Sequence, residues 1–283
     1  MSIVEKAVDK HRKLDKLTPI KDKRVINDAR IGGGPHIPTG AGQVDIELNH
    51  EQLAKEGLTP YGETADKIVD EFRRIKRPLL SAAFEEHQEG AERENLVMIA
   101  SALPAEGKTF TAMNLAMCIA LERDRTVLLV DADVAKPHVS RILNVHNEPG
   151  LMDLLQDHTI DIGDVLLQTD MPSLKIIPAG QRHRHAAEML SSQRMEAIAE
   201  ELATRYSDRI ILFDTSPILQ TSEAQSLATL MGQLVLVVHA GQTPQRAVNR
   251  TLELLGDRKI DIVLNKCRAP ASSPYYGGYY GQN

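Results

Sequence analysis

The feature that most constrains the fold is an alternation of short apolar segments with longer amphipathic ones, beginning near residue 95. The apolar runs of strand length are 96–101, 126–131, 174–180, 209–214, 233–239 and 260–265. Segments with helical periodicity lie between most of them, as at 108–122, 185–205 and 244–256. Buried strands that alternate with helices form a parallel sheet covered on both faces. The sequence therefore predicts an α/β fold whose ligands bind beyond the carboxyl ends of the strands.

Composition and charge exclude several classes of protein. Of the 283 residues, 42% are hydrophobic and 25% are charged, which is ordinary for a globular chain. No run approaches the ~20 apolar residues that span a bilayer, and the charged N-terminus lacks the apolar core of a secretory signal, so we expect a cytoplasmic protein. The net charge of −6 argues against a nucleic-acid partner. The two cysteines, Cys118 and Cys267, have no metal-ligand spacing, which argues against a metal-cluster carrier.

Residues 1–61 are predicted to form an N-terminal region of helix and linker. Helical periodicity over 1–17 indicates an amphipathic helix, which is either a solvated surface helix or a docking element for a partner or anionic lipid. A small helix is expected at 49–57, capped by Asn49. A longer amphipathic helix is predicted over 62–87, where Pro78 either kinks or ends it.

A phosphate-binding loop is predicted where the first strand meets the next helix. The loop ends in Gly107, Lys108 and Thr109, close to the Walker A pattern, although Ala102 replaces its first glycine. Backbone N–H groups at a helix N-terminus attract phosphate. In this arrangement Lys108 bridges the β- and γ-phosphates and the Thr109 hydroxyl binds Mg²⁺.

Acidic side chains follow two of the other predicted strands. Asp131 and Asp133 are two residues apart on an extended segment, so both project toward one site. Asp214 ends another apolar strand in the Walker B manner. Together with the phosphate loop, these strand ends predict a nucleotide site. Asn265, at the end of the last strand, is interpreted either as a hydrogen-bond partner of adenine or as a simple turn residue.

The chain resembles the bacterial tyrosine kinases of polysaccharide export in three motifs. These are the GKT loop in which Ala102 replaces the first glycine, the VLLVDAD strand and the ILFDTSP strand. The resemblance covers about 65–265 and the tail, and points to the exosortase-associated tyrosine autokinases. It implies a P-loop fold of the partitioning-ATPase-like class, with ATP and Mg²⁺ as cofactors. It also implies a separate membrane-spanning chain-length-determinant protein as activator, a cognate tyrosine phosphatase, and a place at the inner membrane through that partner.

The same resemblance implies roles for individual residues. The implied catalytic set is Lys108, Asp131, Asp133 and Asp214, in which Asp131 is the expected base for the tyrosine hydroxyl. The implied nucleotide contacts are Ala105, Glu106, Gly107, Lys108, Thr109, Phe110 and Asn265, and the implied Mg²⁺ ligands are Thr109, Asp133 and Asp214. Ala105 stands where family loops often have glycine, which restricts the loop.

A self-association motif of this family, E-x-x-R-x-x-R, matches Glu71, Arg74 and Arg77. On a helix these three side chains fall within one sector of about 120°. The resemblance therefore implies a ring-type oligomer. The alternative is an intrahelical Glu–Arg pair, which contributes only about 0.2–0.5 kcal/mol.

The tail at 268–283 contains four tyrosines without apolar periodicity, namely Tyr275, Tyr276, Tyr279 and Tyr280. It is either a sticky, disordered tail or the substrate of the kinase domain at 62–267. Glycine spacing lets each tyrosine enter a cleft, and the tail spans up to ~55 Å at ~3.4 Å per residue. That length reaches a neighbouring subunit, so we expect phosphorylation in trans.

Two other functions fit the same motifs. A switch-type ATPase of the partitioning and division-site class would hydrolyse ATP without a protein acceptor. Such ATPases usually carry a second lysine early in the loop, and the stretch SALPAEG has none. The other alternative is a non-catalytic nucleotide-binding assembly subunit. Ala102 and Ala105 are compatible with it, because they depart from the glycines of the usual loop.

Overall fold

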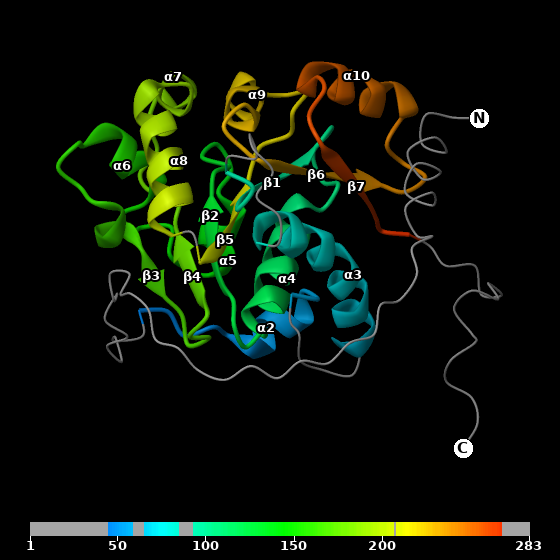
Figure 1. Cartoon of the computed structure of the whole chain (residues 1–283), viewed down its shortest axis with the longest axis horizontal. Helices are drawn as coiled ribbons and strands as arrows, with labels where there is room; N and C mark the ends of the chain where they lie inside the picture. Colours follow the sequence, from blue (N-terminus) through cyan, green and yellow to red (C-terminus); the bar gives the residue numbers. More distant parts are fainter. Residues whose placement is uncertain (1–44, 59–64, 85–92, 207, 268–283) are drawn as a thin grey trace, which may run out of the picture. The chain divides into compact units, whose positions relative to one another are not determined.

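A seven-stranded sheet forms the centre of the described part of the chain, in a computed structural model (Figure 1). The structure describes residues 45–58, 65–84, 93–206 and 208–267. The strands are ordered β3-β4-β2-β5-β1-β6-β7, and every neighbouring pair is parallel except β3 with β4. The predicted α/β fold with a parallel sheet is therefore confirmed.

Five of the predicted strands have the bounds expected from their apolar runs. These are β1 (Leu96–Ser101), β2 (Thr126–Asp131), β5 (Arg209–Asp214), β6 (Gln233–His239) and β7 (Ile260–Asn265). The sixth, β4 (Leu174–Ile177), is shorter than predicted, because Pro178 follows it and has no N–H to continue the ladder. The two-residue β3 (Leu167–Gln168) was not predicted.

Helices cover both faces of the sheet (Figure 1). One face carries α2 (His50–Lys55), α3 (Ala65–Phe84), α4 (Lys108–Ala120) and α5 (His138–Ile142). The other carries α6 (Leu151–Gln156), the short η1 (Ile162–Val165), α7 (Ala186–Leu190), α8 (Gln193–Arg205) and α9 (Ser222–Ala228). The last helix, α10 (Gln245–Leu255), packs through Val248 against β6. The predicted helix at 185–205 is thus two helices, which are separated at Ser191 and Ser192.

The helix α4 follows β1 directly and is almost entirely buried, because the sheet lies on one side of it and α3 on the other. Most of its circumference is apolar, as an enclosed helix requires, and its buried Thr111 and Asn114 side chains donate hydrogen bonds to backbone carbonyls. Against it α3 places Phe72, Leu79 and the stem of Lys76, all buried. Pro78 does not end α3, which continues to Phe84.

The segment 45–58 packs on the same side of the sheet as α3 and α4. Ile46, Leu48, Leu53 and Leu58 are all buried there, although the sequence assigned them to the N-terminal helix and linker. The Asn49 side chain accepts the predicted capping hydrogen bond from the Gln52 N–H at 3.0 Å. The expected helix at 1–17 and the tail at 268–283 lie outside the described residues. None of the described helices has both the length and the apolarity needed to cross a membrane.

Candidate functional site

The predicted motifs meet because β2, β5 and β1 are neighbours at the centre of the sheet. Parallel strands end at the same edge, so their C-terminal residues come together there. Asp131 pairs directly with Asp214 in the register of β2 and β5. The loop at 102–107 leaves β1 at this edge and leads into α4, whose first residue is Lys108. The tertiary structure therefore builds one site from three separated segments.

The two alanines of the loop are accommodated very differently. Ala102 is fully buried and is not among the residues with positive φ, so its backbone conformation does not require the usual glycine. Ala105 has a φ of +60°, in the left-handed region where a Cβ is unfavourable. Gly107 has a φ of +102°, and a Cβ there would overlap the side-chain amide of Asn265. Glycine is thus essential at 107, dispensable at 102, and replaced at 105 with strain.

Lys108 is held among carboxylates below the loop. Its side chain is buried, which lowers the pKa of the ammonium, while the charges of Asp214, Asp133 and Glu106 oppose that shift. An ammonium group in this position is suited to bind phosphate oxygens. Its neighbour Thr109 donates a hydrogen bond of 2.7 Å to Asp214 Oδ2.

Asp214 is the most deeply buried acid of the site. Burial, together with the charge of Asp131, raises the pKa of Asp214 to about 8. Its Oδ1 atom is buried and accepts no hydrogen bond from any residue that the structure describes. A buried oxygen without a partner, beside the Thr109 hydroxyl, is a fitting ligand set for a hard cation, and Mg²⁺ prefers oxygen ligands of this kind. The residues present therefore fit the predicted Mg²⁺.

The two aspartates after β2 have different surroundings. Asp131 is fully buried, and its Oδ2 accepts hydrogen bonds from the Ser140 N–H at 2.8 Å and the Ser140 hydroxyl at 2.7 Å. Burial raises the pKa of Asp131 to about 6, although the bonds from Ser140 lower it. Asp133 accepts bonds from the Ser216 hydroxyl at 2.7 Å and the Lys136 N–H at 3.1 Å. Asp133 lines the cavity beside the loop, whereas Asp131 does not.

Four side chains fix the conformation of the phosphate loop, one from the loop itself and three from the segments that follow β6 and end β7. The Glu106 carboxylate is buried and accepts hydrogen bonds from the Leu103 N–H, at 2.7 Å, and from the Thr243 hydroxyl. Asn265 Nδ2 donates to the Glu106 carbonyl at 2.9 Å, and Lys266 Nζ donates to the Ala105 carbonyl at 2.8 Å. We call Glu106, Thr243, Asn265 and Lys266 the loop clamp. Asn265 thus contacts the loop backbone, a role that neither interpretation of the sequence included.

A cavity of about 450 Å³ opens beside the loop. It is lined by Pro104, Ala105, Gly107, Lys108, Thr109, Phe110, Asp133, Lys136, His138 and Ile142, with Glu56, Leu58, Pro217 and Gln220. Phe110 also packs against Phe72 of α3, with ring centroids 6.3 Å apart. Most of the predicted nucleotide contacts therefore share one cavity, while Glu106 and Asn265 belong to the loop clamp instead.

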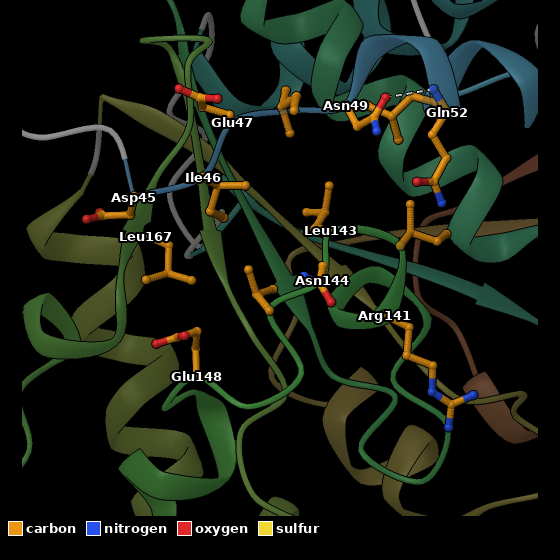
Figure 2. Close-up of a pocket in the computed structure, with 14 residues that line it drawn as sticks. Asp45, Ile46, Glu47, Asn49, Gln52, Arg141, Leu143, Asn144, Glu148 and Leu167 are labelled. Atoms are coloured by element: carbon orange, nitrogen blue, oxygen red, sulfur yellow. Dashed lines mark hydrogen bonds between the residues drawn. The ribbon is translucent and has the colours of Figure 1, made fainter.

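A larger cavity of about 770 Å³ lies between the segment at 45–53 and the chain around α5 (Figure 2). Asp45, Glu47 and Glu148 line it together with Arg141 and several apolar side chains. It contains none of the residues of the loop or of the acidic strand ends, so its size does not make it the site of the chemistry.

The remaining predicted residues lie away from the cavity. Glu71, Arg74 and Arg77 are exposed on α3, and no ion pair among the described residues joins Glu71 to either arginine. The predicted phosphorylation sites in the tail fall outside the described residues. Ser140, Ser216 and Thr243 were missed by the sequence analysis, because a lone hydroxyl carries no sequence signal until the fold places it beside a site residue.

The phosphate loop, its lysine and the acidic strand ends define the class of this protein as a P-loop nucleotide-binding domain. The AAA domain family (AAA_31) matches residues 97–255. YwqD, a tyrosine-protein kinase of Bacillus subtilis, is 34% identical over 188 residues, which cover 65% of this chain and 77% of YwqD. The chain therefore has an AAA domain and belongs to the family of bacterial tyrosine-protein kinases that includes YwqD.

Solved structures agree with this assignment. The kinase domain of the Escherichia coli tyrosine kinase ETK has a TM-score of 0.67 at 25% identity and covers 85% of this chain and 94% of that domain. The kinase domain of VpsO has a TM-score of 0.56 at 29% identity, and the match covers 69% of this chain and 98% of that domain. The full-length etk of Escherichia coli K12 is 29% identical, but the match spans only 28% of its length. A Cyanothece McdA–ATP complex, at 21% identity and a TM-score of 0.51, shares the fold alone.

Proposed function

We propose that this chain is an ATP-dependent tyrosine autokinase that phosphorylates its own C-terminal tyrosines in trans. The observation that carries the proposal is the convergence of Lys108, Thr109 and Asp133 on one cavity, with Asp214 directly beneath Thr109. The kinase family supplies the expectation of a tyrosine acceptor, and the four tyrosines of the tail supply the acceptor itself. In this proposal the reaction regulates exopolysaccharide biosynthesis and export.

Phosphoryl transfer depends mainly on charge stabilisation and on positioning of the reacting groups. The N–H groups at the start of α4 and the Lys108 ammonium supply positive charge where the γ-phosphoryl group develops negative charge. When bound, Mg²⁺ would supply a further positive charge, and Thr109 and Asp214 are the residues that would hold it. The loop clamp keeps the loop carbonyls turned away from the phosphates, since two of them accept bonds from Asn265 and Lys266.

The attacking tyrosine must lose its proton, because its hydroxyl has a pKa of about 10. A base must lie within hydrogen-bond reach of that hydroxyl. We assign this role to Asp133, which lines the cavity. Asp131 was the base implied by family resemblance, but its side chain is fully buried and bonded to Ser140. Asp131 then acts by fixing the start of α5 below the site.

The proposed assembly follows from the location of the acceptor. A tail of up to ~55 Å reaches a neighbouring subunit, and Glu71, Arg74 and Arg77 are exposed and available for contact between copies. A separate membrane-spanning chain-length-determinant protein would act as activator and hold the cytoplasmic chain at the inner membrane. A cognate tyrosine phosphatase would remove the phosphate groups from the tail.

The test is mass spectrometry of the full chain after incubation with ATP and Mg²⁺, with and without the cytoplasmic peptide of the activator. We expect phosphate on Tyr275, Tyr276, Tyr279 or Tyr280 and none in Lys108→Ala. Lys259→Ala, which removes an exposed lysine remote from the cavity, should retain full transfer. Full autophosphorylation of Lys108→Ala would refute the proposal. ATP hydrolysis without phosphotyrosine would indicate a switch-type ATPase, and nucleotide binding alone would indicate an assembly subunit.

A further inference from the structure

A basic groove of about 560 Å³ runs between α3 and the turn that leads from α4 to β2. It is lined by Arg73, Arg74, Lys76, Arg77, Leu80, Ser81, Glu122, Asp124 and Arg125. It shares no lining residue with the cavity beside the phosphate loop. Five basic side chains against two acidic ones make it a candidate site for an anionic ligand.

The charges in this basic groove are only partly neutralised by the protein. Arg73 pairs with Asp70 at 2.7 Å, and Lys76 pairs with Glu122 at 2.6 Å. The other three arginines, Arg74, Arg77 and Arg125, form no ion pair with any described residue. The basic groove also contains one carboxylate, Asp124, that forms no ion pair within the described part of the chain. The basic groove therefore has an excess of positive charge available for a ligand.

One guanidinium group of the basic groove is held in place by a neighbouring ring. The Arg125 guanidinium carbon lies 4.0 Å from the centroid of the Phe84 ring, a cation–π contact that limits its freedom. Arg74 and Arg77 are three residues apart on one helix, so they are neighbours on its surface. Leu80 adds a half-buried apolar contact. Guanidinium groups bind phosphate through two parallel hydrogen bonds and stack on aromatic rings, so this basic groove suits a phosphorylated aromatic side chain.

We propose that the basic groove binds the phosphorylated form of residues 268–283 of this chain. The proposal rests on the autokinase function proposed above. The tail contains no Asp or Glu, so before phosphorylation its side chains carry no negative charge with which the arginines could pair. Each phosphotyrosine adds a charge of about −1.5 to −2 and three strong acceptor oxygens. Phosphorylation therefore creates the ligand, and the charge of one tyrosine pair matches the unpaired arginines.

A consequence concerns self-association. Arg74 and Arg77 belong both to the basic groove and to the E-x-x-R-x-x-R motif expected to join copies of the chain. A phosphorylated tail and a second copy then compete for the same guanidinium groups. Phosphorylation would release the oligomer by this competition, in addition to the repulsion between charged tails.

The experiment uses full-length chain dephosphorylated with a tyrosine phosphatase and a synthetic fluorescent peptide of residues 271–283. Because the peptide carries four phosphotyrosines from synthesis, its binding does not depend on kinase activity. By fluorescence anisotropy at physiological salt, we expect it to bind at least about tenfold more tightly than the unphosphorylated peptide. The double variant Arg74→Ala/Arg77→Ala should lose at least about tenfold in affinity, and Arg74→Lys, which keeps the charge but not the bidentate geometry, should lose less.

The matched control is Arg246→Ala, an exposed arginine of α10 that forms no ion pair with the described residues and should leave binding unchanged. Thermal unfolding verifies the fold of each variant. Equal binding of both peptides, or phosphopeptide binding that survives the double variant, would overturn the proposal. So would binding of phosphatidylglycerol vesicles through these arginines when the phosphopeptide does not bind, which would assign the surface to a membrane.

Discussion

Ala105 illustrates at the residue scale how a substitution within a motif changes local energetics without removing a functional group. Its φ of +60° places a Cβ in the left-handed region, at a cost of roughly 1–2 kcal/mol. The strain persists because Lys266 holds the Ala105 carbonyl, while Thr243 and Asn265 hold the next residue, Glu106. The loop conformation is therefore imposed by the loop clamp rather than chosen by the local sequence.

Ala105→Gly should stabilise the nucleotide-free chain by about 0.5–1 kcal/mol, because relief of the left-handed strain exceeds the entropy that glycine adds to the unfolded state. Urea unfolding measures the change. Ala135→Gly is the matched control, since Ala135 is exposed in a turn without positive φ, and it should destabilise by about 0.5–1 kcal/mol. Equal destabilisation by both substitutions would show that the backbone of Ala105 is not strained.

Asn265→Ala separates two roles of this side chain. If Asn265 positions the loop through the Glu106 carbonyl, the variant should weaken binding of ATP and of inorganic triphosphate alike, by about three- to tenfold for one hydrogen bond. Isothermal titration without turnover measures both affinities. A loss confined to ATP would instead support the adenine contact. Asn147→Ala, an exposed amide outside both cavities, should change neither affinity.

At the scale of elements, the contact between α3 and α4 places a buried lysine against the end of α4. Lys76 Nζ donates to the Cys118 carbonyl at 2.8 Å and pairs with Glu122 at 2.6 Å. The Lys76 side chain is 9% exposed, whereas in the pair of Lys55 with Glu51 on α2 the side chains are 74% and 85% exposed. Both pairs are Lys–Glu, but Lys76 is buried and joins two elements, whereas the pair of Lys55 and Glu51 is exposed within one helix.

Lys76→Ala should therefore destabilise the chain by about 2–3 kcal/mol, because it leaves the buried Cys118 carbonyl without its charged donor and removes the packed stem of Lys76 from the contact between α3 and α4. Lys55→Ala should change the free energy of unfolding by less than about 0.5 kcal/mol, as is usual for exposed pairs. Chemical denaturation of the two variants gives the comparison. Similar small effects would mean that the α3–α4 contact does not depend on this pair.

The whole molecule presents its nucleotide cavity and the E-x-x-R-x-x-R motif on separate surfaces, so catalysis and assembly can be altered independently. Glu71, Arg74 and Arg77 are exposed, and their removal should leave the fold intact. Changing all three to alanine should convert the proposed oligomer to monomer, since loss of central arginines commonly costs an interface more than about 2 kcal/mol.

Size-exclusion chromatography with light scattering checks this expectation. The control triple variant, Arg246→Ala/Arg250→Ala/Glu253→Ala, makes the same change in charge on α10 and should retain the oligomer. An unchanged mass for the α3 variant would contradict self-association through this motif, and a change in both variants would attribute assembly to overall charge.

Much of the fold could be predicted because its determinants are local. The five strands with the expected bounds are continuous apolar runs, and such runs are recognisable wherever both faces of a strand are buried. The phosphate loop was recognisable because its Gly, Lys and Thr are needed at fixed spacing, and the acidic strand ends because a buried strand that ends in a carboxylate is unusual. The short β3 and α5 escaped prediction because so few residues establish no periodicity.

The sequence by itself thus determined the strands, the phosphate loop, the acidic residues at the strand ends and the family to which the chain belongs. Only the tertiary structure decided that Asp133 lines the cavity while Asp131 is enclosed, that Asn265 holds the loop, and that Ala102 is relaxed while Ala105 is strained. The reason is the range of the interactions involved. Glu106 bonds to Thr243 and Asn265 bonds to Glu106 across more than a hundred residues, and contacts over that distance exist only once the sheet has brought the strand ends together.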